Sequence, residues 1–161
     1  MRAVSDTSVI SNLAIIGRLE FLKQRYGSVM IPPGVARELS ALSHAAAKSR
    51  ITAAIADGWL VIENAPPAPP PLPFLLDSGE TEAVALALAT KADVLLMDEK
   101  RGRQAARHVG LAVGGVLGEL LHAKQNGLLP DLQAEISRLR TEARFFITPE
   151  IERFLLSQAG E

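Results

Sequence analysis

Residues 92–108 read ADVLLMDEKRGRQAARH, in which one aspartate joins a short apolar run to a basic segment. Residues 94–97 have the length and apolar character of a strand that is buried on both faces of a sheet. Residues 100–108 carry charged side chains at helical spacing. We therefore predict a strand that ends at Asp98 and a helix that follows it, which is one unit of an alternating α/β fold.

The same pattern of a short apolar run followed by a helix recurs along the chain. Strands are predicted at 2–5, 28–31, 59–62, 94–97 and 110–113. Helices are predicted at about 10–22, 34–39, 44–56, 80–89, 100–108, 116–126, 131–142 and 149–158. Short apolar strands that alternate with helices indicate a parallel sheet covered on both faces. We expect an α/β fold with about five parallel strands and extra helices at the C-terminus.

Two of the predicted helices begin with capping signals. Asp77 or Ser78 precedes the helix at 80–89, and Asp77 together with Glu80 fits a capping box. Thr148-Pro149 places a cap and a first-position proline before the last helix.

We expect residues 1–161 to form a single domain, with about 128–161 as a C-terminal helical extension. A length of 161 residues with 48% apolar side chains is sufficient for one compact core. The absence of cysteine excludes disulfides, a thiol nucleophile and a zinc knuckle. No signal peptide is evident, and no run approaches the roughly 18 apolar residues of a membrane span. We expect a cytoplasmic protein without membrane contact.

The formal net charge of −1 argues against a passive nucleic-acid binder. Such proteins are usually strongly basic, because neutralisation of phosphates dominates their affinity. If this chain handles nucleic acid, carboxylates loaded with divalent cations have to attract the phosphates, since the ions reverse the local sign of the charge.

Two aspartates follow predicted strands directly. Asp6 comes after the strand at 2–5, and Asp98 comes after the strand at 94–97. In an open parallel sheet, ligands bind beyond the carboxyl ends of the strands. If these two strands are neighbours, both carboxylates meet at that edge.

Two glutamates in the first turns of predicted helices are candidates to join the aspartates. Glu38 follows the second strand, and Glu82 precedes the fourth. Glutamates at this position also compensate the helix dipole. We weigh that explanation evenly for Glu80 and less for Glu82, because the apolar stripe after Glu82 places it at the edge of the buried face.

Four clustered carboxylates require a counter-charge, because their mutual repulsion raises pKa values or recruits a metal. An all-oxygen set favours Mg²⁺ or Mn²⁺ over zinc. We expect Asp6, Asp98 and Glu82 to bind the ion and Glu38 to join them in catalysis. Such an ion can activate a water for attack on a phosphodiester and stabilise the leaving oxygen.

Polar residues beside the aspartates have two interpretations each. Thr7, Ser8 and Asn12 can hold a carboxylate, a metal-bound water or a phosphate, whereas Thr7 and Ser8 can equally serve as helix caps. The basic face of the helix at 100–108 can pair with phosphates or be a solvated surface, and we weigh the two equally. Its members are Lys100, Arg103, Gln104 and Arg107, of which we expect Arg103 to turn toward the carboxylates.

The proline-rich segment at 66–73, PPAPPPLP, is expected to adopt extended polyproline II. Its position inside the domain favours a stiff connection between a strand and a helix over a docking ligand for a partner module.

Four motifs in this order resemble the PIN-like domains. They are AVSDTS at 3–8, PPGVARELS at 32–40, LLDSGETEAVALAL at 75–88 and DVLLMDEKRGRQAA at 93–106. The chain looks most like a prokaryotic branch long labelled a domain of unknown function and related to the VapC-type toxin nucleases. The resemblance runs from about residue 1 to 127, and the final helices also look like that branch.

The resemblance implies a Rossmann-like three-layer α/β/α sandwich, RNA cleavage that depends on Mg²⁺ or Mn²⁺, and a homodimer. A toxin of this kind is partnered by a small antitoxin protein. By position, the acidic residues of the family fall on Asp6, Glu38, Glu82 and Asp98, with Glu80 as a competitor for Glu82.

The sequence departs from the family at 113–117, where many members carry a further carboxylate or amide. Here Gly114 and Gly115 occupy that stretch, which leaves open whether one ion or two are bound. A catalytically weak or inactive module that binds RNA or a protein is therefore the alternative function. Ser8 argues against a phosphatase of the haloacid dehalogenase type, and the lack of a glycine-rich turn after the first strand argues against a dinucleotide enzyme.

Overall fold

The computed structural model describes residues 1–67 and 71–161, and its centre is a five-stranded, all-parallel sheet. The strands lie in the order β3-β2-β1-β4-β5. Their bounds are Ala3–Ser5 (β1), Val29–Ile31 (β2), Leu60–Ile62 (β3), Val94–Leu96 (β4) and Val113–Gly114 (β5). The chain leaves β1 toward one edge and returns to its other side with β4, so the topological switch point lies between β1 and β4. The predicted α/β fold with a parallel sheet is confirmed.

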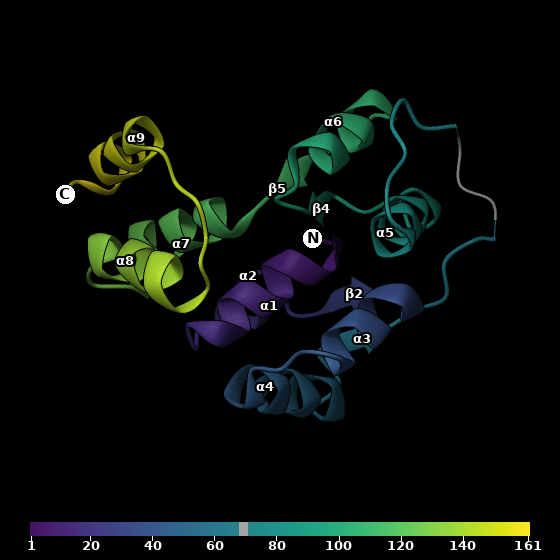
Figure 1. Cartoon of the computed structure of the whole chain (residues 1–161), viewed down its shortest axis with the longest axis horizontal. Coiled ribbons are helices and arrows are strands. Elements are labelled where there is room, and N and C mark those ends of the chain that lie inside the picture. Colours follow the sequence, from purple (N-terminus) through teal and green to yellow (C-terminus); the bar gives the residue numbers. More distant parts are fainter. Residues whose placement is uncertain (68–70) are drawn as a thin grey trace.

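Helices cover both faces of the sheet (Figure 1). Their bounds are Thr7–Ile15 (α1), Glu20–Tyr26 (α2), Pro33–Ser40 (α3), Ala45–Ala56 (α4), Ser78–Ala89 (α5), Lys100–His108 (α6), Val116–Gln125 (α7), Leu132–Glu142 (α8) and Pro149–Ala159 (α9). Successive strand residues point to opposite faces, so Ala3 joins a large core with α1, α2, α4 and α7, and Val4 joins a smaller core with α5 and α6.

The segment after Asp6 forms two helices where the sequence pattern predicted one at about 10–22. Gly17 has a φ of +72° and follows the end of α1. This left-handed conformation is readily adopted by glycine and ends a helix. Leu19 and Leu22 are nevertheless buried, because α2 packs on the same core as α1.

The fifth strand begins later than the predicted range of 110–113. Gly110 has a φ of +87° and belongs to the turn after α6, so the strand cannot start there. The backbone N–H groups of Leu95 and Met97 donate to the carbonyls of Ala112 and Gly114. The pairing therefore brings Gly114 to the carboxyl edge of the sheet.

Both predicted capping signals are confirmed. Asp77 accepts from the backbone N–H of Glu80, and the Glu80 side chain accepts from the backbone of Asp77. Thr148 caps α9 with Pro149 in its first turn. Residues 68–70, in the middle of the proline-rich segment, lie outside the described residues, so its polyproline interpretation stays a prediction.

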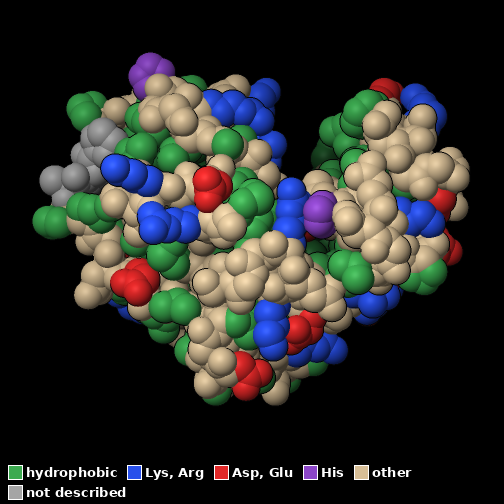
Figure 2. Space-filling view, turned by 180° about the vertical axis from the view of Figure 1, so that it is seen from behind, with side chains coloured by type: hydrophobic (Ala, Val, Ile, Leu, Met, Phe, Trp, Pro, Cys, Tyr) green, Lys and Arg blue, Asp and Glu red, His purple; other side chains and the backbone are tan. Residues whose placement is uncertain are grey.

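The last three helices form a lobe that Figure 1 shows at one end of the molecule, with α9 near α7 and α8. Leu132, Ile136 and Leu155 of this lobe belong to the large core. From behind, Figure 2 shows a hollow between the lobe and the part that carries α5 and α6. Across the described ranges, no helix is long and apolar enough to cross a membrane.

Candidate metal-binding site

Asp6 lies directly after β1 and is held at the switch point by the neighbouring strand. Its backbone N–H donates to the carbonyl of Leu96 in β4 at 3.0 Å. Its side chain is the N-cap of α1 and accepts from the backbone N–H of Val9 at 3.4 Å and from the Ser8 hydroxyl at 3.2 Å. Asp6 is only 4% exposed. A buried carboxylate therefore rests on two long hydrogen bonds.

Asp98 approaches the same edge from β4. Its carboxylate accepts from the backbone N–H of Val116 at 3.2 Å, at the start of α7. The approach requires Gly115, because a Cβ at that position would collide with the Asp98 carboxylate oxygen. The absence of a side chain at Gly115 thus makes room for Asp98.

The two aspartates have raised pKa values. Burial raises the pKa of Asp6 to about 7, and the nearby negative charge of Asp98 adds to the effect. Burial also raises the pKa of Asp98 to about 6, although the Val116 N–H and Arg103 act in the opposite direction. Burial thus disfavours the ionised form of both carboxylates.

An acidic cavity of about 300 Å³ opens beside Asp6. Its lining is Asp6, Thr7, Ser8, Ser11, Glu38, Asp77, Glu80 and Glu99. Carboxylates from four different segments converge here, and no lysine or arginine is among the lining residues. A divalent cation is the type of ligand that this charge distribution favours.

Glu38 reaches the cavity from α3. Its carboxylate accepts from the Thr7 hydroxyl at 2.7 Å. It also lies over Gly79 in the first turn of α5, where a Cβ would collide with it. Glu38 therefore connects the start of α1, through Thr7, with the first turn of α5, through Gly79.

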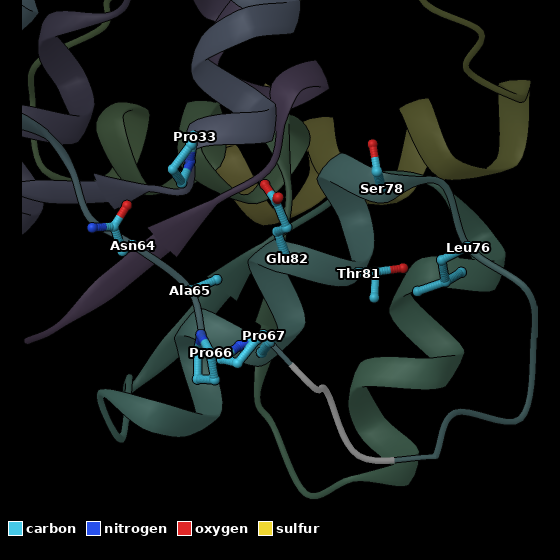
Figure 3. Close-up of a pocket in the computed structure, with 10 residues that line it drawn as sticks. Pro33, Asn64, Ala65, Pro66, Pro67, Leu76, Ser78, Thr81 and Glu82 are labelled. Atoms are coloured by element: carbon cyan, nitrogen blue, oxygen red, sulfur yellow. The ribbon is translucent and has the colours of Figure 1, made fainter.

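Glu82 is not brought into the acidic cavity. Its carboxylate accepts from the backbone N–H of Gly34 at 2.6 Å, in the first turn of α3. A Cβ at Gly34 would collide with it, so the α3–α5 contact is reciprocal: each helix presents a glycine to a glutamate of the other. Glu82 lines a neighbouring cavity instead (Figure 3). Its role as a metal ligand stays a prediction.

Glu80 lines the acidic cavity in the place that the sequence pattern favoured for Glu82. Burial and the charge of Asp77 raise its pKa. In the sequence, Glu80 was explained by the capping box with Asp77, so that motif did not indicate that it would also line the cavity. The available signal was that Asp77, the N-cap of α5, and Glu80 are three residues apart and therefore lie on one side of the start of this helix.

The basic helix α6 contributes one side chain near the aspartates. Arg103 is half-buried, donates to the carbonyl of Met97 at 2.9 Å and lies close enough to Asp98 to lower its pKa. Lys100 and Arg107 are exposed. Asn12 is half-buried in α1 and is not among the residues that line the acidic cavity.

The donor set fits a hydrated divalent ion. Within residues 1–67 and 71–161, no three Asp, Glu or His side chains lie close enough to hold an ion by themselves. Mg²⁺ commonly keeps several waters and uses only one or two carboxylates. Asp6 and Asp98 provide such a pair, and the remaining carboxylates of the cavity can hold the waters.

Comparisons with known proteins agree with the observed fold and identify a family. The chain matches the family model described as DUF3368, a PIN domain, over residues 2–161. It is similar in structure to a PilT N-terminus domain protein from the hyperthermophilic archaeon Sulfolobus solfataricus P2, with a TM-score of 0.55 and 19% sequence identity. The match covers 76% of this chain and 93% of that chain, and it shows a shared fold. No curated protein matches the chain.

Proposed function

This chain belongs to the PIN domain family, whose members are typically metal-dependent nucleases, and we propose that it is an endoribonuclease that uses Mg²⁺ or Mn²⁺. The observation that carries the proposal is the pairing of Asp6, which is buried, with Asp98, which is half-buried, at the switch point of the sheet. Their pKa values are raised to about 7 and about 6, and a bound cation would stabilise the ionised form of both carboxylates.

Asp6 and Asp98 would hold the ion directly, with Glu80 and Glu38 facing it through waters. An ion held by these residues would supply an activated water and would neutralise charge on the scissile phosphate. Thr7 fixes the Glu38 carboxylate by its hydrogen bond, and Ser8 fixes Asp6. A carboxylate held in this way can orient the attacking water and accept its proton.

Arg103 and the exposed Lys100 and Arg107 would bind the substrate backbone. All three belong to α6, which begins directly after Asp98 and Glu99. Phosphates paired with these side chains would lie beside the acidic cavity. The basic helix therefore compensates for the overall negative charge of the protein at the place where the RNA would bind.

The test is cleavage of a mixed, structured RNA pool with Mn²⁺ or Mg²⁺ by the wild type and by Asp6→Asn. Loss of outer-shell partners costs about 10- to 100-fold, so loss of a direct ligand should lower the rate by at least about 100-fold. Asp57→Asn, at an exposed position at the end of α4, is the matched control and should leave the rate unchanged. Equal rates in Asp6→Asn and the wild type would disprove the assignment.

A second candidate is a non-catalytic module that binds RNA or a protein. It is favoured by Val113–Gly115, a stretch without a carboxylate, where the Val116 N–H contacts Asp98. Such a module would tolerate Asp6→Asn and lose binding when Lys100, Arg103 or Arg107 is replaced by alanine. Filter binding of the same RNA pool distinguishes the two functions.

We also propose that the protein acts in the cytoplasm as the toxin of a toxin–antitoxin pair and forms a homodimer. The support is the resemblance to toxin nucleases and a set of exposed apolar side chains on the C-terminal lobe. These are Phe146, Ile151 and Phe154. Apolar side chains gathered on a surface are typical of protein interfaces. Light scattering of the wild type and of Phe154→Glu tests whether this surface forms the dimer.

A further inference from the structure

Figure 3 shows the lining of a second cavity, of about 530 Å³. This cavity lies on a different face of α5 from the acidic cavity. Ser78, Thr81 and Glu82 line it, whereas Asp77 and Glu80 line the acidic cavity. The first turns of one helix therefore form a wall of both cavities. An α-helix with its side chains is about 10 Å wide, so the two cavities are near neighbours.

Both cavities open at the same edge of the sheet. Pro33 and Asn64 of the second cavity follow the carboxyl ends of β2 and β3. Asp6 and Asp98 follow the carboxyl ends of β1 and β4, and β1 is paired with β2. A strand of RNA whose phosphate lies at Asp6 can therefore place an adjacent base over β2 and β3.

The lining combines flat apolar groups with a few polar ones. Pro33, Pro66 and Pro67 supply the rigid apolar surfaces (Figure 3). Protein sites for small ring systems are typically of this kind and of this size. Single-stranded RNA is recognised by bases that leave the stack and enter such sites, where their edges are hydrogen-bonded.

The lining offers acceptors at Thr81 and Glu82, and Asn64 and Ser78 add N–H and O–H donors. The Thr81 hydroxyl donates to the carbonyl of Asp77, which leaves its lone pairs to accept. One Glu82 oxygen accepts from Gly34, and the other forms a long, exposed salt bridge of 3.9 Å with Arg37, which leaves it room to accept a hydrogen bond. Acceptors of this type match the exocyclic amino groups of guanine, adenine and cytosine, which uracil lacks.

We propose that this cavity binds an unpaired base with an exocyclic amino group next to the scissile phosphate. The inference rests on the proposed ribonuclease activity and specifies its substrate as single-stranded RNA with a base preference. A peptide is less favoured as the occupant, because the cavity adjoins the catalytic edge and its acceptors suit amino-bearing rings.

The experiment maps the cleavage sites of the wild type in single-stranded RNA of random sequence and in the same RNA annealed to its complement. We expect a strong bias against uracil at one position next to the cut, and slow cleavage of the duplex because paired bases cannot enter the cavity. Ala65→Trp, on the loop after β3, should fill the cavity and flatten the bias. Thr81→Val removes one acceptor and should weaken the bias about fivefold.

The matched control is Thr141→Val in α8. Thr141, like Thr81, donates its hydroxyl to the carbonyl four residues earlier but is far from both cavities in sequence and on an exposed face. Its cleavage pattern should equal that of the wild type. A wild type that cuts RNA with a pattern unchanged by Ala65→Trp and Thr81→Val would overturn the base cavity and leave the ribonuclease standing.

A wild type that cuts no RNA contradicts the proposed function instead. The cavity is then tested by titrating the protein with single-stranded hexanucleotides of guanine, cytosine, adenine or uracil. Weaker binding of the uracil hexamer, with the difference lost in Ala65→Trp, would still support the base cavity. Equal binding of all four would overturn it.

Discussion

The acidic cavity and the C-terminal lobe both contain buried carboxylates, but in the part of the chain that the structure describes only those of the lobe are paired with arginine side chains. Asp6 is 4% exposed, and Glu119 and Glu135 of the lobe are 3% and 4% exposed. Glu135 accepts from Arg18 at 2.6 Å, and Glu119 accepts from Arg25 at 3.1 Å and from the Tyr26 hydroxyl at 2.6 Å. Among the described residues, no salt bridge joins Asp6 to a cation.

The comparison separates a structural carboxylate from a functional one. A buried carboxylate needs a partner, because its charge is costly away from water. Arginine is a permanently charged partner, and Arg18 and Arg25 join the lobe to α2 and to the turn before it. Asp6 has only a hydroxyl and a backbone N–H, so above its raised pKa a cation from outside the chain would stabilise its charge. Burial by itself therefore says little about function, whereas burial without compensation points to a cation site.

The largest expected effect is on the pH dependence of stability without metal. The folded pKa of Asp6 is raised to about 7, so its contribution to stability is complete below its unfolded pKa and is lost as the pH rises through about 7. The loss is on the order of 4 kcal/mol. Urea unfolding should therefore show that the unfolding free energy of the wild type falls relative to that of Asp6→Asn as the pH rises from about 4 to about 8, the range over which Asp6 titrates.

Magnesium provides the control for that measurement. Near neutral and alkaline pH, Mg²⁺ should raise the unfolding free energy of the wild type, because the ion binds the folded state. Asp6→Asn should respond much less. If the stability of the wild type does not depend on Mg²⁺, Asp6 is not part of a cation site, and the proposed difference between the cavity and the lobe is wrong.

The next effect is the loss of a compensated pair in the lobe. Glu119→Ala leaves Arg25 and the Tyr26 hydroxyl without their acceptor, and breaking a buried pair of this kind costs about 3 kcal/mol. Urea unfolding measures the cost. RNA cleavage by the fraction that stays folded should be unchanged, since Glu119 does not line the acidic cavity. Loss of cleavage in fully folded Glu119→Ala would contradict the division into two regions.

A smaller effect is expected from adding one methyl group beside Asp98. Gly115→Ala should displace the Asp98 carboxylate and weaken Mn²⁺ binding by about tenfold, as loss of a supporting contact does at other metal sites. Gly118→Ala, three residues later in α7, has no heavy atom within 4 Å of the new Cβ, and it should leave Mn²⁺ affinity unchanged. Calorimetric titration compares the two variants, and equal affinities would show that Gly115 has no such role.

The smallest effect distinguishes two neighbouring glutamates of α5. Glu80→Gln should lower the cleavage rate about tenfold, because Glu80 lines the acidic cavity. Glu82→Gln should change it less, since glutamine still offers an oxygen to the Gly34 N–H. Steady-state cleavage assays measure both rates. The reverse order of effects would restore Glu82 as the metal ligand that the family resemblance implies.

Several features of the site followed from the sequence because their causes are local. An apolar run followed by an aspartate placed Asp6 and Asp98 at strand ends, and helical spacing placed Arg103 on the face near them. The capping residues Asp77 and Thr148 act within one helical turn, so their patterns suffice. The absence of a carboxylate at Gly114 and Gly115 was also visible, although its consequence was not.

The sequence by itself determined the α/β class, most helix bounds and the two aspartates, since these depend on patterns that repeat within a few residues. Only the tertiary structure decided that β1 and β4 are neighbours, that Glu80 rather than Glu82 faces Asp6, and that Gly115 admits Asp98. The crossing of α3 and α5 fixes where each glutamate points, because each carboxylate lies over a glycine of the other helix. Such contacts join residues far apart in the chain, and packing selects them rather than local propensity.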